Sequence, residues 1–202
     1  MANINHSALT DPYLHEPIGA ASAAKGKVYV SDGAGSGTWH YIDAGWGYYK
    51  DNATAQNFTT TPTLLSINGG DSTTAETYLP YAIRGSGSLW NTTTDKITPI
   101  QAGDAYSVRL NLPVTAEHSS PTQLTVELDI AGSTYGSAIV LFNHYEVTGK
   151  STPYTISISF PVFVGSTFIA NGGQFWLTTD TGNLDVTAPA ITLAMLNNGA
   201  NV

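Results

Sequence analysis

The first residues in this chain that could do chemistry form a glycine-rich run, Gly-Ala-Gly-Ser-Gly at residues 33–37. Such a run can bring backbone amides close to a phosphate group, but a phosphate loop also needs a preceding strand, a following helix and usually a lysine. The next four residues, 38–41, are Thr-Trp-His-Tyr, which do not favour a helix. We therefore interpret the glycine run as a flexible hinge.

Carboxylates and histidines could support acid–base catalysis or metal binding. Glu127 and Asp129 alternate with apolar residues, a pattern that fits the solvated face of a strand. Asp180 and Asp185 have an Asn between them and could hold a weak calcium ion, although a hairpin turn accounts for them more simply. No pair of the five histidines has the spacing of a zinc site on a helix, and cysteine is absent. We expect no enzyme activity, no cofactor and no metal site; a metal held by copies of one histidine in an oligomer stays an open alternative.

Aromatic side chains offer one binding chemistry, because a sugar ring can stack on an exposed indole. Trp90 follows the Gly- and Ser-rich residues 85–88, and it is a possible glycan contact if its ring lies on the surface. Trp176 is the weaker candidate, because it lies between the apolar residues Phe175 and Leu177 and could itself be buried in the core.

The composition limits which partners the protein can have. The 202 residues include 7 basic and 15 acidic side chains, a net charge of −8, and no cluster of Lys or Arg, so we expect neither nucleic acid nor an anionic membrane as a partner. Charged residues make up only 11% of the chain, against about 25% in an average protein. Thr, Ser, Asn and Gly supply the polarity instead, and such neutral surfaces favour packing against other protein chains. The sequence has neither a secretion signal nor a long apolar span.

The N-terminal quarter lacks the pattern of a compact core. Pro12 and Pro17 favour an extended path, and residues 28–30 form a short apolar strand before the glycine hinge. Aromatic residues close the segment, at Trp39, Tyr41, Trp46, Tyr48 and Tyr49. Because aromatic side chains are costly to leave in water, we predict that this segment packs on another surface. The prediction is an extended anchoring arm and linker over residues 1–57, followed by a β-domain over residues 58–202.

The second part of the chain alternates apolar and polar residues with a period of two, which predicts an all-β sandwich or jelly roll. Residues 138–142 form a continuous apolar run that would suit a strand buried on both faces, and residues 171–173, Asn-Gly-Gly, suit a tight hairpin. The expected strands cover residues 63–67, 78–83, 106–112, 124–130, 138–142, 154–162, 168–170, 175–178 and 191–196.

Two resemblances add to this prediction. The segments His6–Gly19 (HSALTDPYLHEPIG) and Val28–Trp39 (VYVSDGAGSGTW) resemble the N-terminal segment of tailed-bacteriophage head-fibre, capsid-decoration and some tail-fibre proteins. The β-domain resembles the trimeric jelly-roll heads of viral fibres and of the tumour-necrosis-factor and C1q group.

These resemblances imply a capsid decoration (cement) protein that is a homotrimer and has the major capsid protein as its partner. It would be made in the host cytoplasm and lie on the outer capsid surface of the virion. The implied alternative is a receptor-binding tail-fibre or spike head that recognises host surface glycans. The residues expected to anchor the arm to the capsid are Asp11, Pro12, Tyr13, His15, Glu16, Pro17, Val28, Tyr29, Val30 and Trp39.

Overall fold

The computed structural model describes residues 22–24, 27–31, 37–41, 44–52, 55–132, 135–136 and 138–197. The chain divides into two compact units, Met1–Ile42 and Asp43–Val202. Strands account for nearly all of the regular structure in both units, and the one α-helix of the described ranges is the short α1 (Ser166–Asn171). No helix in this described part is long and apolar enough to cross a membrane. The all-β prediction is confirmed.

The first sheet of the larger unit is built around β8 (Ala105–Ala116), its longest strand. β8 pairs along one side with β11 (Tyr154–Phe163) and along the other with β14 (Ala190–Asn197) and then β13 (Leu184–Val186). Two shorter strands extend the sheet, β3 (Gly45–Lys50) beside β14 and β4 (Gln56–Phe58) beside β13. All of these pairings are antiparallel.

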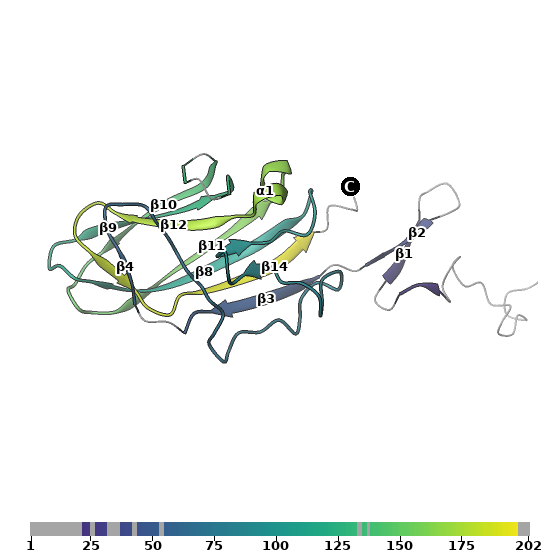
Figure 1. The fold of residues 1–202 in the computed structure, drawn as a ribbon, viewed down its shortest axis with the longest axis horizontal. Coiled ribbons are helices and arrows are strands. Elements are labelled where there is room, and N and C mark those ends of the chain that lie inside the picture. The colour runs from purple at the N-terminus through teal and green to yellow at the C-terminus, as the bar shows by residue number, and fades with distance from the viewer. Residues whose placement is uncertain are drawn as a thin grey trace, which may run out of the picture. The chain divides into compact units, whose positions relative to one another are not determined.

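The second sheet has the strand order β10 (Ile139–Val147), β9 (Thr122–Asp129), β12 (Gln174–Thr179) and β5 (Thr63–Leu64). From β8 the chain crosses to the second sheet for β9 and β10, returns for β11, crosses again for β12 and returns for β13 and β14. This exchange of strands between two facing antiparallel sheets is a jelly roll. Figure 1 shows the two layers, with β9, β10 and β12 above β8, β14 and β3.

The core lies between the two sheets. Alternate residues of β8, such as Val108 and Leu110, are fully buried, as are Val126 of β9 and Leu177 of β12. Burial of each such side chain stabilises the folded state by about 1.5–3 kcal/mol. The period-two pattern therefore determines which face of each strand turns inward.

Five of the predicted strands are confirmed, at residues 106–112, 124–130, 154–162, 175–178 and 191–196. The prediction for 78–83 is wrong, because this segment forms turns in which the Ile83 amide donates to the Pro80 carbonyl at 3.0 Å. Of residues 63–67, only Thr63–Leu64 pairs as a strand. Residues 168–170 lie in helix α1, which ends where Gly172 adopts a φ of 76° and donates to the Phe168 carbonyl. The predicted tight hairpin at 171–173 is therefore the end of a helix.

We predicted that the apolar run at 138–142 is a strand buried on both faces. It forms a strand, but the strand is not buried on both faces. It belongs to β10, an edge strand of the second sheet, where Ile139, Val140 and Phe142 are exposed. Among the described residues β10 pairs only with β9, and more than half of the Val140 and Phe142 side chains, 51% and 55%, is exposed.

The division between the units falls at residues 42 and 43, earlier than the predicted boundary at 57 and 58. The physical reason is β3, which pairs with β14 over six residues, so that Tyr49 is buried in the jelly-roll core. The aromatic residues Trp46, Tyr48 and Tyr49, which we assigned to the arm, therefore belong to the β-domain.

Candidate functional site

In the described part of the first unit, β1 (Lys27–Ser31) and β2 (Gly37–Tyr41) form an antiparallel hairpin. Tyr29 and Trp39 lie opposite each other in register, with ring centroids 5.4 Å apart in an edge-to-face arrangement. Val28 and Val30 are 39% and 41% exposed. A hairpin of this size is only marginally stable by itself, and this one leaves apolar surface in solvent.

Gly37, the first residue of β2, lies very close to β1. A Cβ atom at this position would lie 2.2 Å from the carbonyl oxygen of Val30 and 2.9 Å from the Tyr29 ring. Glycine therefore lets β2 begin directly against β1.

The four predicted anchor residues within the described ranges, Val28, Tyr29, Val30 and Trp39, are brought together in this hairpin. The other six lie outside the described residues: Asp11, Pro12, Tyr13, His15, Glu16 and Pro17. Residues 32–36 of the predicted hinge also lie outside them.

Trp90 lies in β6 (Trp90–Asn91), which pairs with β7 (Lys96–Ile97). Its side chain is 1% exposed, and its indole nitrogen donates to the Ile67 carbonyl at 2.8 Å. The condition for stacking on a sugar, a ring on the surface, is therefore not met, because the loop that carries Ile67 provides a partner for the indole inside the core.

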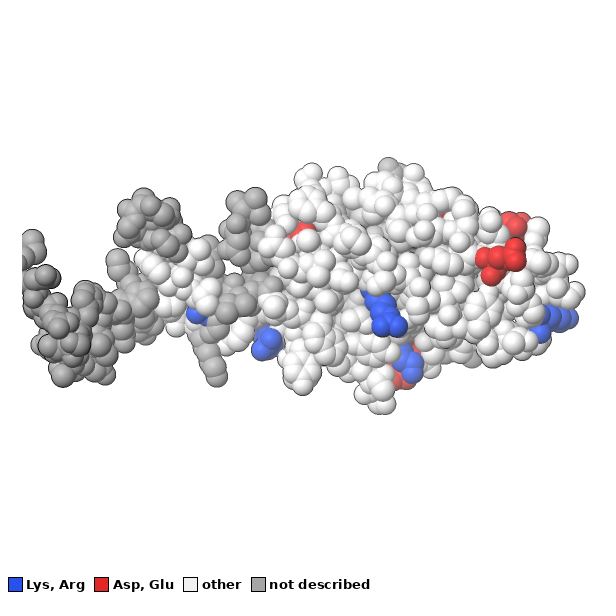
Figure 2. All heavy atoms as spheres, turned by 180° about the vertical axis from the view of Figure 1, so that it is seen from behind, with Lys and Arg blue, Asp and Glu red and all other residues white. Residues whose placement is uncertain are grey.

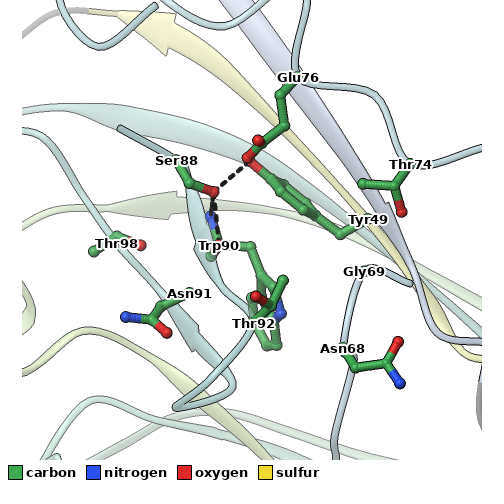
Figure 3. Close-up of a pocket in the computed structure, with 10 residues that line it drawn as sticks. All are labelled: Tyr49, Asn68, Gly69, Thr74, Glu76, Ser88, Trp90, Asn91, Thr92 and Thr98. Carbon is green, nitrogen blue, oxygen red and sulfur yellow. Dashed lines mark hydrogen bonds between the residues drawn. The ribbon is translucent and has the colours of Figure 1, made fainter. Parts of the chain in front are cut away.

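Trp90 nevertheless lies in the wall of a pocket of about 480 Å³ (Figure 3). The pocket lies between β3, the segment after β5, and the β6–β7 hairpin. Its lining is made almost wholly of hydroxyl and amide side chains, with one carboxylate. The lining residues are Tyr49, Asn68, Gly69, Thr74, Glu76, Ser88, Trp90, Asn91, Thr92 and Thr98.

The Tyr49 phenol connects the pocket to the core. Its oxygen accepts from the Leu89 amide at 3.0 Å and lies 2.9 Å from the Ser88 hydroxyl. Burial raises the pKa of Tyr49 to about 12, and the negative charge of Glu76 adds to the increase. The phenol is therefore neutral at physiological pH and is a fixed hydrogen-bonding group.

We predicted that Glu127 and Asp129 lie on a solvated face, but both are buried, and their partners are Ala131, Tyr135 and Gly136. Glu127 accepts a hydrogen bond from the Tyr135 hydroxyl, and Asp129 accepts from the Ala131 and Gly136 amides at 2.7 and 2.6 Å. Burial is the main reason why the pKa of Tyr135 rises to about 12, with Glu127 contributing. The two carboxylates therefore hold Ala131, Tyr135 and Gly136 against strand β9.

Asp180 and Asp185 do not converge on a shared site. Asp180 accepts from the Gln123 amide at 2.7 Å, whereas Asp185 accepts from the Asn57 side chain at 2.9 Å. Within the described ranges no group of three or more His, Asp or Glu side chains could hold a metal ion.

Charged side chains are sparse on the surface. Figure 2 shows only a few Lys, Arg, Asp and Glu residues on a face that is mostly without charge. In β8, β11 and β14 the residues that point away from the core are mostly small and neutral, and Arg109 is the only charged one among them. At the end of β11, Phe163 is 69% exposed. This outer face of the first sheet has a composition that suits contact with protein.

No protein-family model matches the sequence, and no curated protein matches it either. Among solved structures, PRD1 vertex protein P5 is similar over 96% of this chain and 93% of its own, with 15% identity and a TM-score of 0.46. The globular domain of zebrafish complement 1qA protein matches over 78% of this chain and 99% of its own (12% identity, TM-score 0.45). Eiger TNF from S. frugiperda matches over 77% and 94% (10% identity, TM-score 0.44). Because these TM-scores lie below 0.5, the jelly-roll assignment rests on the strand order of this chain itself.

Proposed function

We propose that this chain is a non-enzymatic structural protein of a bacteriophage virion, a capsid decoration protein that docks through its N-terminal arm. The observation that carries the proposal is the β1–β2 hairpin, a separate unit whose Val28 and Val30 side chains are exposed. The N-terminal resemblance described above supplies the identity of the partner, the major capsid protein. The net charge of −8 opposes contact with DNA and favours a position on the outer capsid surface.

The proposal includes a homotrimer formed by the jelly-roll domains. Its support is the outer face of the first sheet, where Ser107, Ala194 and Thr192 present a small, neutral surface around Arg109. A trimer would carry three arms, so that modest affinity of each arm would become strong attachment through avidity. Because the arms would bind the assembled lattice only, they would stabilise the head by mass action.

Rebinding to particles stripped of the protein tests the arm. The full-length protein is compared with a Val28→Thr/Val30→Thr variant, in which threonine keeps the shape and strand preference of valine but lowers the apolar surface. We expect at least about a tenfold weaker attachment of the variant, because the lost burial is multiplied over several arms. A matched control is Ser119→Thr, at an exposed position of the β-domain. If the double variant binds as well as the control, the hairpin is not the anchor.

A second candidate function is a receptor-binding tail-fibre or spike head that recognises host surface glycans. The observation that favours it is the pocket beside Trp90, whose lining carries hydroxyl, amide and carboxylate groups. Copy number separates the two functions. A decoration protein is expected in hundreds of copies per particle, comparable with the major capsid protein, whereas a tail-tip protein is expected in only a few.

A further inference from the structure

The pocket beside Trp90 has one chemical property that limits its ligand. Of the residues that line it, Glu76 alone carries a charge, and no lining residue is basic. A bound anion would therefore meet the negative carboxylate of Glu76 without any cation to offset the repulsion. An anionic ligand is disfavoured by this arrangement, while a neutral ligand rich in hydroxyl groups is not.

Several polar groups at the mouth of the pocket are available to such a ligand. Within the described part of the chain, the side-chain hydroxyls of Thr92 and Thr98 make no hydrogen bond, and both residues are exposed. The Asn91 side-chain oxygen accepts from the Thr93 and Thr94 amides at 2.9 and 3.0 Å, which fixes its orientation and leaves its NH₂ group as a donor. Figure 3 shows Asn91, Thr92 and Thr98 on one side of the pocket and Glu76 and Thr74 on the other.

The aromatic residues of the pocket determine how a ligand would be held. Tyr49 and Trp90 are each only 1% exposed, so neither offers an open ring face for stacking. Recognition would depend on hydrogen bonds. The Glu76 carboxylate already accepts from the Tyr49 hydroxyl, so it would accept from one ligand hydroxyl, and the Asn91 amide would donate to another ligand oxygen. The volume, about 480 Å³, falls within the range of small-molecule sites.

We propose that this pocket binds a short neutral saccharide and discriminates against acidic sugars. The inference rests on the receptor-binding function proposed above, for which it names the binding site and the class of ligand. Sugar binding can be measured on the isolated protein without particles, so this test can fail while attachment to capsids succeeds. Because the interactions are polar and solvent-exposed at the rim, we expect dissociation constants in the millimolar range for single sugars.

The test is a titration of the full-length, ¹⁵N-labelled protein followed by NMR. The chain has four tryptophans, and Trp90 alone lines the pocket, so the indole signals of Trp46 and Trp176 serve as internal controls. Matched pairs of ligands differ only by a carboxylate: glucose and glucuronate, galactose and galacturonate. N-acetylglucosamine, mannose and their disaccharides complete the neutral set. We expect a saturable shift of the Trp90 indole signal with at least one neutral sugar and a much smaller one with its acidic partner.

Two sets of variants determine whether the pocket itself is responsible. Glu76→Gln keeps the shape of the pocket and removes its charge, so the preference for a neutral sugar over its uronate should fall by about tenfold. Thr92→Val and Thr98→Val each remove one hydroxyl, and we expect affinity to fall by about three- to tenfold. Ser119→Ala, outside the pocket lining, is the matched control, and the Trp90 indole signal of each free variant reports whether the pocket is intact.

Three results would overturn the inference. One is the absence of a saturable shift with every neutral sugar up to about 100 mM, well above a millimolar dissociation constant. Another is equal binding of neutral and acidic partners. The third is unchanged affinity in both threonine variants while their Trp90 signals remain in place.

Discussion

The indole nitrogen of Trp90 donates a hydrogen bond of 2.8 Å to the carbonyl oxygen of Ile67, and both side chains are buried. This bond joins the β6–β7 hairpin to the segment that follows β5, two parts of the chain that have few strand pairings of their own. The Trp90 ring also stacks near Phe175 of β12, at 6.5 Å between centroids. Trp90 therefore fixes the wall of the polar pocket to the core of the jelly roll.

Replacing Trp90 by Phe should lower the free energy of unfolding by about 2–4 kcal/mol. The variant leaves the Ile67 carbonyl without its donor and leaves a cavity where the larger ring was. Urea unfolding followed by circular dichroism measures the loss. Trp46→Phe is the matched control, because Trp46 is 38% exposed and should cost less than about 1 kcal/mol. Equal losses in the two variants would contradict the role assigned to Trp90.

Gly37→Ala should destabilise the β1–β2 hairpin and leave the β-domain unchanged. The added Cβ would lie 2.2 Å from the Val30 carbonyl oxygen, so β2 must move away from β1. Hydrogen exchange measures both parts in one experiment. We expect faster exchange of the amides in residues 27–31 and 37–41, with the protection of β8 and β14 retained. Undiminished protection in the hairpin would show that the close approach of the two strands is not required.

The sequence predicts the central strands of the jelly roll because each of them buries one face. In β8 and β11 the alternation of apolar and polar residues matches the burial observed along the strand. The apolar triplet in α1 is compatible with either a strand or a helix, and the glycine conformation that ends the helix is not visible in a residue pattern. The exposure of β10 follows from its position at a sheet edge, which depends on the topology rather than on its own residues.

Of the hairpin in the arm, only the strand at residues 28–30 was predicted, from its local apolar pattern, and its pairing with β2 was not. The pocket was not predicted either, because its lining comes from residues between Tyr49 and Thr98 that have no common spacing. Only Trp90 was selected in advance, and its burial depends on a carbonyl 23 positions away. Sequence reasoning also missed β3, whose glycines and aromatics resemble a loop more than a strand.

Ala194→Glu should dissociate the proposed trimer. Ala194 lies on the outer face of the first sheet, between Ser107 of β8 and Trp46 of β3, so a glutamate at this position would place three carboxylates in or near the interfaces. Light scattering after size-exclusion chromatography should show a trimer for the parent chain and a monomer for the variant, with the β-sheet circular dichroism retained. Ser119→Glu adds the same charge at a distant exposed site and should remain trimeric. A parent chain that is monomeric would refute the oligomeric part of the proposal.

Asp180 should contribute to stability at neutral pH and lose that contribution in acid. The Gln123 amide, which donates to its carboxylate, is the main reason that its pKa is lowered, with Thr181 adding to the effect. A pKa that is lower in the folded state means stability that is present above the unfolded value and is lost as the pH falls through the folded value. In Asp180→Asn, the decrease in unfolding free energy between pH 6 and pH 3 should be smaller than in the parent chain. An identical decrease would exclude this contribution.

Asp95 should have the opposite pH dependence. Burial raises the pKa of Asp95, and the charge of Asp51 adds to the effect, although the Ile67 amide and the Ser66 hydroxyl both donate to its carboxylate. A pKa that is higher in the folded state means a contribution that is complete below the unfolded value, about 3.9, and is lost as the pH rises through the folded value. Asp95→Asn keeps an oxygen to accept both bonds and suits the positive φ of 51° at this position. The unfolding free energy of the variant minus that of the parent chain, measured by urea unfolding, should therefore increase from pH 4 to pH 7. A difference that decreases over this range would mean that the Asp95 carboxylate is stabilised in the folded protein.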